Sequence, residues 1–236
     1  MPTLLLRLAG PLQSWGIGSR FSFRDTALEP TKSGVLGLLC AAAGVPREDD
    51  ETLAQLTELQ MGVRVDREGR LVQDFHTVGG GQVGGRPHGV ARANGGKPTT
   101  VLSRREYLAD ADFLVGLHHT DCKLLTRLDE ALQRPVWPLC LGRHGFVPAL
   151  PPRIGVVEQE LAEALGQWPW RPRQGETLAA NGLRLVLETE EPAAETRCDV
   201  PVSFRHDARR FRLRRVHTTW IRLRAHTHAE EINLGS

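Results

Sequence analysis

The 236-residue sequence is poor in several kinds of residue, and each shortage excludes a class of protein. Its few cysteines are widely spaced and form no C-x-x-C pair, which excludes a disulfide scaffold and a cysteine-based zinc site. They are Cys40, Cys122, Cys140 and Cys198. No apolar run approaches the roughly 18 residues of a transmembrane helix, and no signal peptide begins the chain. We therefore expect a cytoplasmic protein that makes no membrane contact.

Catalytic and cofactor motifs are also scarce. The histidines form no H-E-x-x-H pattern, there is no G-x-S-x-G, and no Ser or Thr follows Lys97 in the register of a phosphate-binding P-loop. We expect neither a metal nor a cofactor. A metal-independent ribonuclease needs only a base and an acid beside a phosphate, for example His76 or His144 with Tyr107. That alternative stays open.

The chain has almost no lysine among its 30 basic residues and a net charge of only +2. The charge is uneven, because residues 205–224 hold eight arginines and one acid. Arginine pairs with phosphates through two donors and stacks on bases, so this segment predicts a defined anionic contact. Two alternatives remain: a charged edge strand in solvent, and an arginine bias that comes from a GC-rich coding sequence.

The N-terminal stretch predicts a buried strand that ends at Gly10-Pro11 and a helix that begins near Thr31. The first turn of this helix holds Lys32 and Ser33. Hydroxyls, an ammonium and free backbone N–H groups at a helix start suit a phosphate. The alternative is that Thr31 or Ser33 only caps the helix and Lys32 is a solvated charge.

Between strand and helix, residues 13–24 mix aromatic and basic side chains. Trp15 and Phe21 lie among Arg20 and Arg24, an arrangement that suits base stacking with phosphate pairing. The alternative is a loop whose aromatic rings fold back on the core.

Two further stretches are rich in turn-forming residues. Residues 79–100 are glycine-rich and contain Arg92 and Lys97; such an arm cannot bury itself, and we expect it to order on nucleic acid or to remain a plain loop. Proline-rich residues 135–152 exclude a helix, and Gly142 predicts a tight turn that presents Arg143 and His144.

The order of elements predicts an α+β fold. The first 135 residues read strand, helix, strand, strand, arm, strand, strand, helix, with a hairpin turn at residues 67–69. This order suggests a ferredoxin-like domain, similar to an RNA-recognition motif, over residues 1–150. A composition change near residue 150 predicts a small β-rich C-terminal domain over residues 151–236.

Five segments, in this order, resemble the CasD family, a subunit of the type I-E CRISPR Cascade complex. They are Leu5–Gly16, Pro30–Leu39, Asp74–Val78, Arg105–Phe113 and Leu141–Arg143. The resemblance implies a ferredoxin-like domain with a long thumb hairpin. It also implies binding of the 5′ handle of the CRISPR RNA (crRNA), beside the backbone subunit and the large subunit, while a different subunit cuts the precursor. Relatives in another subtype cut it themselves.

By position, the resemblance implies that handle RNA lies near the helix start, the arm 79–100 and the turn after residue 140. We therefore predict a non-catalytic RNA-binding subunit of antiviral defence, with a metal-independent endoribonuclease as the alternative. The predicted RNA-binding residues are Trp15, Arg20, Arg24, Lys32, Ser33, Arg92, Lys97, Leu141, Gly142, Arg143 and His144.

Overall fold

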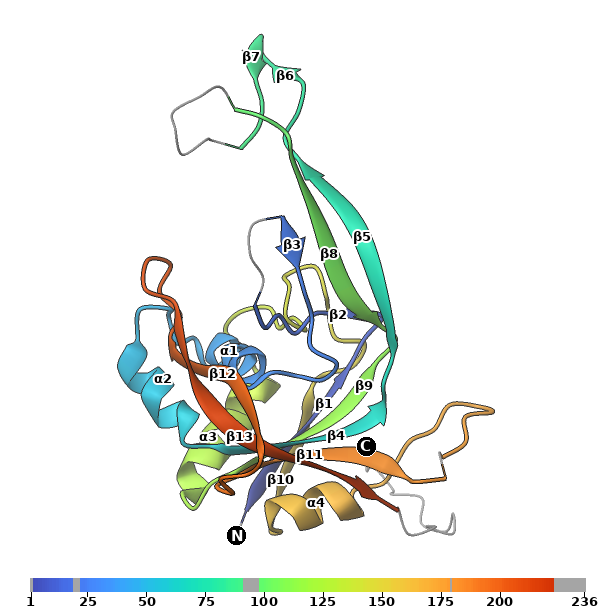
Figure 1. Cartoon of the computed structure of the whole chain (residues 1–236). Helices are drawn as coiled ribbons and strands as arrows, with labels where there is room; N and C mark the ends of the chain where they lie inside the picture. Colours follow the sequence, from blue (N-terminus) through green and yellow to red (C-terminus); the bar gives the residue numbers. More distant parts are fainter. Residues whose placement is uncertain (1, 19–21, 91–97, 179, 223–236) are drawn as a thin grey trace, which may run out of the picture.

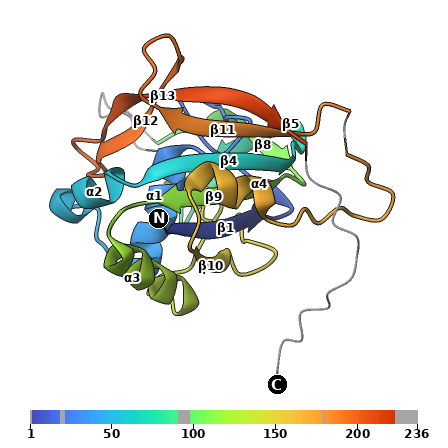
Figure 2. The ribbon, with the colours of Figure 1, turned by 90° about the horizontal axis from the view of Figure 1, so that it is seen from below.

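The computed structural model describes residues 2–18, 22–90, 98–178 and 180–222, in which a mixed α+β fold is built on an antiparallel sheet (Figures 1 and 2). The seven strands lie in the order β10 (Arg153–Val157), β1 (Thr3–Ala9), β9 (Asp112–His118), β4 (Gln60–Arg67), β11 (Leu183–Thr189), β13 (Arg210–Ile221) and β12 (Glu195–Ser203). No helix among these residues is long and apolar enough to cross a membrane.

Helices cover both faces of this sheet, which is why its central strands are apolar on both sides. Leu4, Leu6 and Leu8 of β1 pack in the core beneath α1 (Lys32–Ala43), α2 (Asp50–Thr57) and α3 (Cys122–Gln133). On the other face, Leu5 packs in a smaller core with residues of α4 (Leu161–Gln167). Every residue of β9 is buried, as expected for a strand between two layers.

The helix ends follow local signals that are visible in the sequence. The Thr31 hydroxyl accepts a hydrogen bond from the Gly34 N–H, so Thr31 is the N-cap of α1. The helix ends at Gly44, whose φ of 71° is the left-handed conformation that glycine adopts readily. Asp49 and Asp121 cap α2 and α3 in the same way as Thr31.

A second sheet projects from the main one as a long hairpin of β5 (Arg70–Val78) and β8 (Val101–Ala109), which pair over nine residues (Figure 1). The short strands β2 (Leu12–Gln13) and β3 (Phe23–Arg24) also pair with β8. Near the far end lie β6 (Gln82–Val83) and β7 (Arg86–Pro87). The described parts of the arm expected at residues 79–100, which are residues 79–90 and 98–100, therefore lie at the tip of this hairpin.

The predicted hairpin turn at residues 67–69 is wrong. β4 pairs with β9 and β11, whereas β5 pairs with β8. Gly69, with a φ of 74°, sits against Ala111 at the point where the chain leaves the main sheet. Two consecutive strands joined by a short turn usually pair as a hairpin. Here the other strands of the fold compete for them, and each of the two pairs elsewhere.

The strands that follow residue 150, where the sequence predicts a domain boundary, belong to the same sheet as the strands before it. β10 pairs with β1, and β11 pairs with β4. Leu161 and Leu165 pack against Leu5 and Leu114, from before residue 150. The arginine-rich strand β13 lies between β11 and β12, so it is not an edge strand.

Candidate nucleic-acid interface

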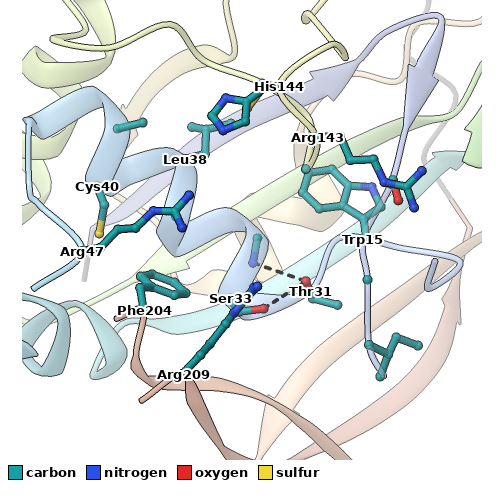
Figure 3. Close-up of a pocket in the computed structure, with 18 of the residues that line it drawn as sticks. Trp15, Thr31, Ser33, Leu38, Cys40, Arg47, Arg143, His144, Phe204 and Arg209 are labelled. Carbon is teal, nitrogen blue, oxygen red and sulfur yellow. Dashed lines mark hydrogen bonds between the residues drawn. The ribbon is translucent and has the colours of Figure 1, made fainter. Parts of the chain in front are cut away.

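A groove of about 1220 Å³ lies over the exposed side of α1 (Figure 3). Its walls come from the loop after β2, from β3, from the turn at residues 142–144, and from the turn that joins β12 to β13. The helix contributes Gly34, Gly37 and Ala41, which share one face because they are spaced three and four residues apart. These small side chains let a ligand approach the helix closely.

Arginine dominates the walls of this groove. The five arginines are Arg24, Arg47, Arg105, Arg143 and Arg209, each from a different segment of the chain. Within the described ranges, none of the five forms an ion pair with a carboxylate. The carboxylate that lines the groove, Asp25, accepts hydrogen bonds from the backbone N–H groups of Ile17 and Gly18. The groove is therefore strongly electropositive and suits an anionic ligand.

Arg143 is the most constrained of these cations. Its guanidinium lies 4.8 Å from the centre of the Tyr107 ring, and its Nη2 donates to the Arg24 carbonyl at 3.4 Å. Its Nη1 is buried and has no hydrogen-bond partner among the described residues. Burial lowers the pKa of Arg143, and the nearby charges of Arg105 and Arg24 lower it further. A phosphate at this position would supply both the missing acceptor and the missing negative charge.

The predicted tight turn is confirmed, and it positions Arg143. Gly142 has a φ of 92°, and a Cβ on it would lie 1.7 Å from the Ser14 carbonyl oxygen. Leu141 beside it is fully buried and accepts a hydrogen bond from the Ser14 N–H at 3.1 Å. Only glycine fits between these two segments. His144 follows, exposed at the rim of the groove.

Trp15 also borders the groove but belongs to the core. Only 1% of it is exposed, and its indole Nε1 donates to Gln13 at 3.1 Å. A Cβ on Gly34 would lie 2.7 Å from the Trp15 ring, so the indole packs closely against α1. The alternative in which this aromatic residue folds back on the core is the one observed, and its ring is not free to stack on a base. Ser33 lines the groove with its hydroxyl 3.4 Å from that of Thr31.

Lys32 does not join this groove, which corrects the expected phosphate seat at the helix start. The residue is 2% exposed, and its Nζ donates to both carboxylate oxygens of Glu188, at 2.9 and 3.0 Å. Its backbone N–H donates to Asp199 at 2.8 Å, and Arg214 also binds Asp199. The predicted phosphate site at the helix start is therefore occupied by carboxylates of the protein itself, and Lys32 connects α1 to the C-terminal strands.

The ribonuclease alternative can be checked against the hairpin register. Val72 lies opposite Tyr107, so His76 is four residues further along β5, about 13 Å away at strand spacing. His76 and Tyr107 are therefore not arranged as an acid–base pair.

The described part of the chain contains no cluster of three or more acidic, histidine or cysteine residues that could hold a metal.

Three predicted RNA-binding residues lie outside the described part of the chain, and three arginines of the groove were not singled out from the sequence. Arg20, Arg92 and Lys97 lie outside the described residues. Sequence reasoning missed Arg47 because it stands apart from any recognisable motif. It also missed Arg105, which begins one of the five segments that resemble the CasD family but was not singled out as an RNA contact. It noticed the arginine-rich segment that contains Arg209 but could not single that residue out.

Comparisons with known proteins point to one family. The sequence profile of the family described as "CRISPR-associated protein (Cas_Cas5)" matches residues 3–217. The "CRISPR system Cascade subunit CasD" of Escherichia coli strain K12 is 38% identical over 166 residues, which are 66% of this chain and 71% of that protein.

Two solved structures share the fold over most of both chains. One, described as "Crystal structure of Cas protein", is 41% identical, with a TM-score of 0.69 over 92% of this chain and 93% of its own. The other, described as "CRISPR RNA-guided surveillance complex", is 38% identical, with a TM-score of 0.74 over 93% and 90%. These matches confirm the resemblance seen in the sequence, and the chain belongs to the Cas5 family of CRISPR-associated proteins.

Proposed function

We propose that this protein is a non-catalytic RNA-binding subunit of a Cascade-type CRISPR surveillance complex, active in the cytoplasm in antiviral defence. In this proposal it holds the 5′ handle of the crRNA in the groove over α1 and contacts other subunits of the complex. The observation that supports it best is the convergence of five arginines without carboxylate partners on one groove. The names of the similar proteins support the assignment to a complex.

We also propose that the fold is ferredoxin-like and that the β5/β8 hairpin is a thumb. The strand order β10-β1-β9-β4, antiparallel throughout, with α1 following β1 and α3 following β9, supports the first assignment. The projection of the hairpin beyond the main sheet supports the second (Figure 1). β11, β12 and β13 then extend the sheet and supply the last wall of the groove.

In the proposed complex, phosphates of the handle pair with Arg24, Arg105 and Arg143, whose side chains line one end of the groove. The Ser33 hydroxyl and the Gly142–His144 turn also line the groove, where they would contact riboses or bases. Leu141 supplies no contact of its own, because it is buried and both of its backbone groups are hydrogen-bonded within the protein. Arg20, Arg92 and Lys97 remain predicted contacts from the sequence.

Direct RNA binding tests this proposal. Arg143→Ala is expected to weaken binding of a handle oligonucleotide at least tenfold, because it removes a charge-assisted contact worth about 1.5–3 kcal/mol. The matched control is Arg173→Ala, since Arg173 is exposed and pairs with Asp110 at 2.5 Å, and Arg173 does not line the groove. Equal affinities for Arg143→Ala and the wild type would contradict the role of the groove. Equal affinity for handle and scrambled RNA would reject handle recognition.

A cleavage assay separates this function from the ribonuclease alternative. We expect repeat RNA to stay intact when it is incubated with the purified protein in EDTA. Discrete cleavage that is lost in His144→Ala would overturn the non-catalytic proposal, because His144 is the histidine among the described residues that lines the groove.

A further inference from the structure

The groove changes character along its length. Figure 3 shows Arg143 and His144 on one side of α1, and Arg47, Phe204 and Arg209 on the other. The first end, which we call the arginine end, contains Arg143 and His144 and is polar and cationic. The second, which we call the aromatic end, is formed by Ala41, Arg47, Phe204, Arg209 and Phe211. It combines apolar rings with positive charge.

The rings at the aromatic end are held in defined places. Phe204 follows β12 directly, is half-buried, and packs against the α1 core. The tip of its ring lies 3.9 Å from where a Cβ on Gly37 would be, so the ring stands over a bare stretch of helix backbone. Phe211, the second residue of β13, is also half-buried, and the Arg209 guanidinium lies 5.2 Å from the centre of its ring.

The charges at the aromatic end are not compensated by the protein. Burial lowers the pKa of Arg209, and the charge of Arg47 lowers it further. Arg47 otherwise approaches His206, with Nη1 and Nε2 3.4 Å apart. Neither arginine pairs with a carboxylate in the described ranges, unlike Arg214 of the adjacent strand, which is bound to Asp199 at 2.6 Å. Two unpaired cations beside two aromatic rings suit a ligand with both a flat apolar face and a nearby anion.

We propose that the aromatic end binds one unstacked nucleobase of the RNA strand whose phosphates occupy the arginine end. The base stacks on Phe204 or Phe211, while Arg209 and Arg47 pair with the phosphates on either side of it. This inference rests on the proposed RNA-binding function and deepens it. It gives the arginine-rich segment a specific role, since Arg209 reaches the groove while Arg214 stabilises the fold.

Fluorescence of a base analogue tests the stacking. Handle RNAs that carry 2-aminopurine at each position in turn are titrated with the full-length protein. Stacking is expected to quench one position more strongly than its neighbours. Phe204→Leu is expected to abolish that quenching and to weaken binding about tenfold, whereas Phe204→Tyr keeps both. Trp220→Leu is the matched control, because Trp220 is 48% exposed and does not line the groove.

An abasic handle RNA supplies an independent measurement. Removal of the quenched base is expected to weaken binding by the wild type about tenfold but to leave Phe204→Leu unchanged, since the variant has already lost the contact. Thermal unfolding of each variant shows whether it is folded. If Phe204→Leu does not fold, the same measurements are made on Phe211→Leu.

The outcomes separate the two proposals. If the RNA binds but no position is preferentially quenched, or if both phenylalanine variants behave like the wild type, the base site is wrong and the proposed function stands. If no RNA binds, both are wrong. If the phenylalanine variants keep RNA binding but lose association with purified partner subunits, the aromatic end is a protein interface and the inference is overturned.

Discussion

Arginine has two distinct roles in this protein, and the nearest carboxylate decides between them. Arg64 is fully buried, yet it is stabilised by Asp66 at 2.6 and 3.0 Å and by the carbonyl of Leu165 at 2.7 Å. Neither Arg143 nor Arg209 pairs with a carboxylate within the described ranges. A cation that is paired with a carboxylate of the protein stabilises the fold, whereas one without a counter-charge is suited to binding an anion.

Lys32 provides a test of this distinction between cations that stabilise the fold and cations that bind RNA. Lys32→Met removes the ammonium but keeps most of the apolar stem, and it leaves the Glu188 carboxylate without its cationic partner. We expect a loss of about 3 kcal/mol in the free energy of unfolding, and unchanged affinity for handle RNA. Urea denaturation and RNA titration measure the two effects. A variant with normal stability and weakened RNA binding would show that Lys32 contacts RNA after all.

At the scale of elements, α1 is held at its start and left open along one side. The backbone N–H of Lys32, the first residue of α1, donates to Asp199 of β12. The Lys32 ammonium donates to Glu188 of β11. The small residues of α1 face the groove. This contact with the C-terminal strands fixes the helix that forms the floor of the groove.

Asp199 makes this contact dependent on pH. Burial alone would raise the pKa of Asp199, but hydrogen bonds and charge from Arg214, together with the Lys32 N–H, outweigh it and lower the pKa below its usual value. A lowered pKa in the folded state stabilises the fold above the unfolded pKa, about 3.9, and this contribution is lost as pH falls through the folded pKa.

We therefore expect Asp199→Asn to be less stable than the wild type by about 3 kcal/mol at neutral pH. The difference should be constant above about pH 5 and should shrink below about pH 4. Denaturant unfolding of both proteins across this range measures it. A difference that does not change with pH would show that the charge of Asp199 does not contribute.

The turn after Leu141 offers a second test at this scale. Gly142→Ala forces a Cβ into the Ser14 carbonyl at a φ that disfavours alanine, so the turn must move and displace Arg143. We expect RNA affinity to fall at least tenfold, with a loss of stability of about 1–3 kcal/mol. Gly145→Ala is the control, because a Cβ there meets nothing within 4 Å. Equal affinities of the two variants would contradict the positioning role of Gly142.

At the scale of the whole molecule, one sheet joins residues from both ends of the chain. A fragment of residues 1–150 lacks β10 and β11, which pair with β1 and β4, and lacks α4, which covers Leu5 and Leu114. We expect this fragment to show no cooperative unfolding transition. Circular dichroism during urea denaturation measures this. A cooperative transition in the fragment would instead support the domain boundary near residue 150 that the sequence predicts.

The sequence by itself determined several local boundaries, because caps and turn glycines act between neighbouring residues. Thr31 marks the start of α1, and Gly142 marks the turn that presents Arg143. Local patterns could not determine that β5 leaves β4, or that β10 and β11 join the main sheet, since strand partners lie far apart along the chain.

The tertiary structure alone decided which cations remain without a counter-charge. The sequence predicts Lys32 and Arg143 as RNA contacts and places Arg209 and Arg214 in an arginine-rich segment, but it does not show which of the four has a counter-charge. The fold places Glu188 and Asp199 against two of them and no carboxylate among the described residues against the other two. Electrostatic pairing depends on distance in space, and folding sets that distance between residues that the sequence keeps apart.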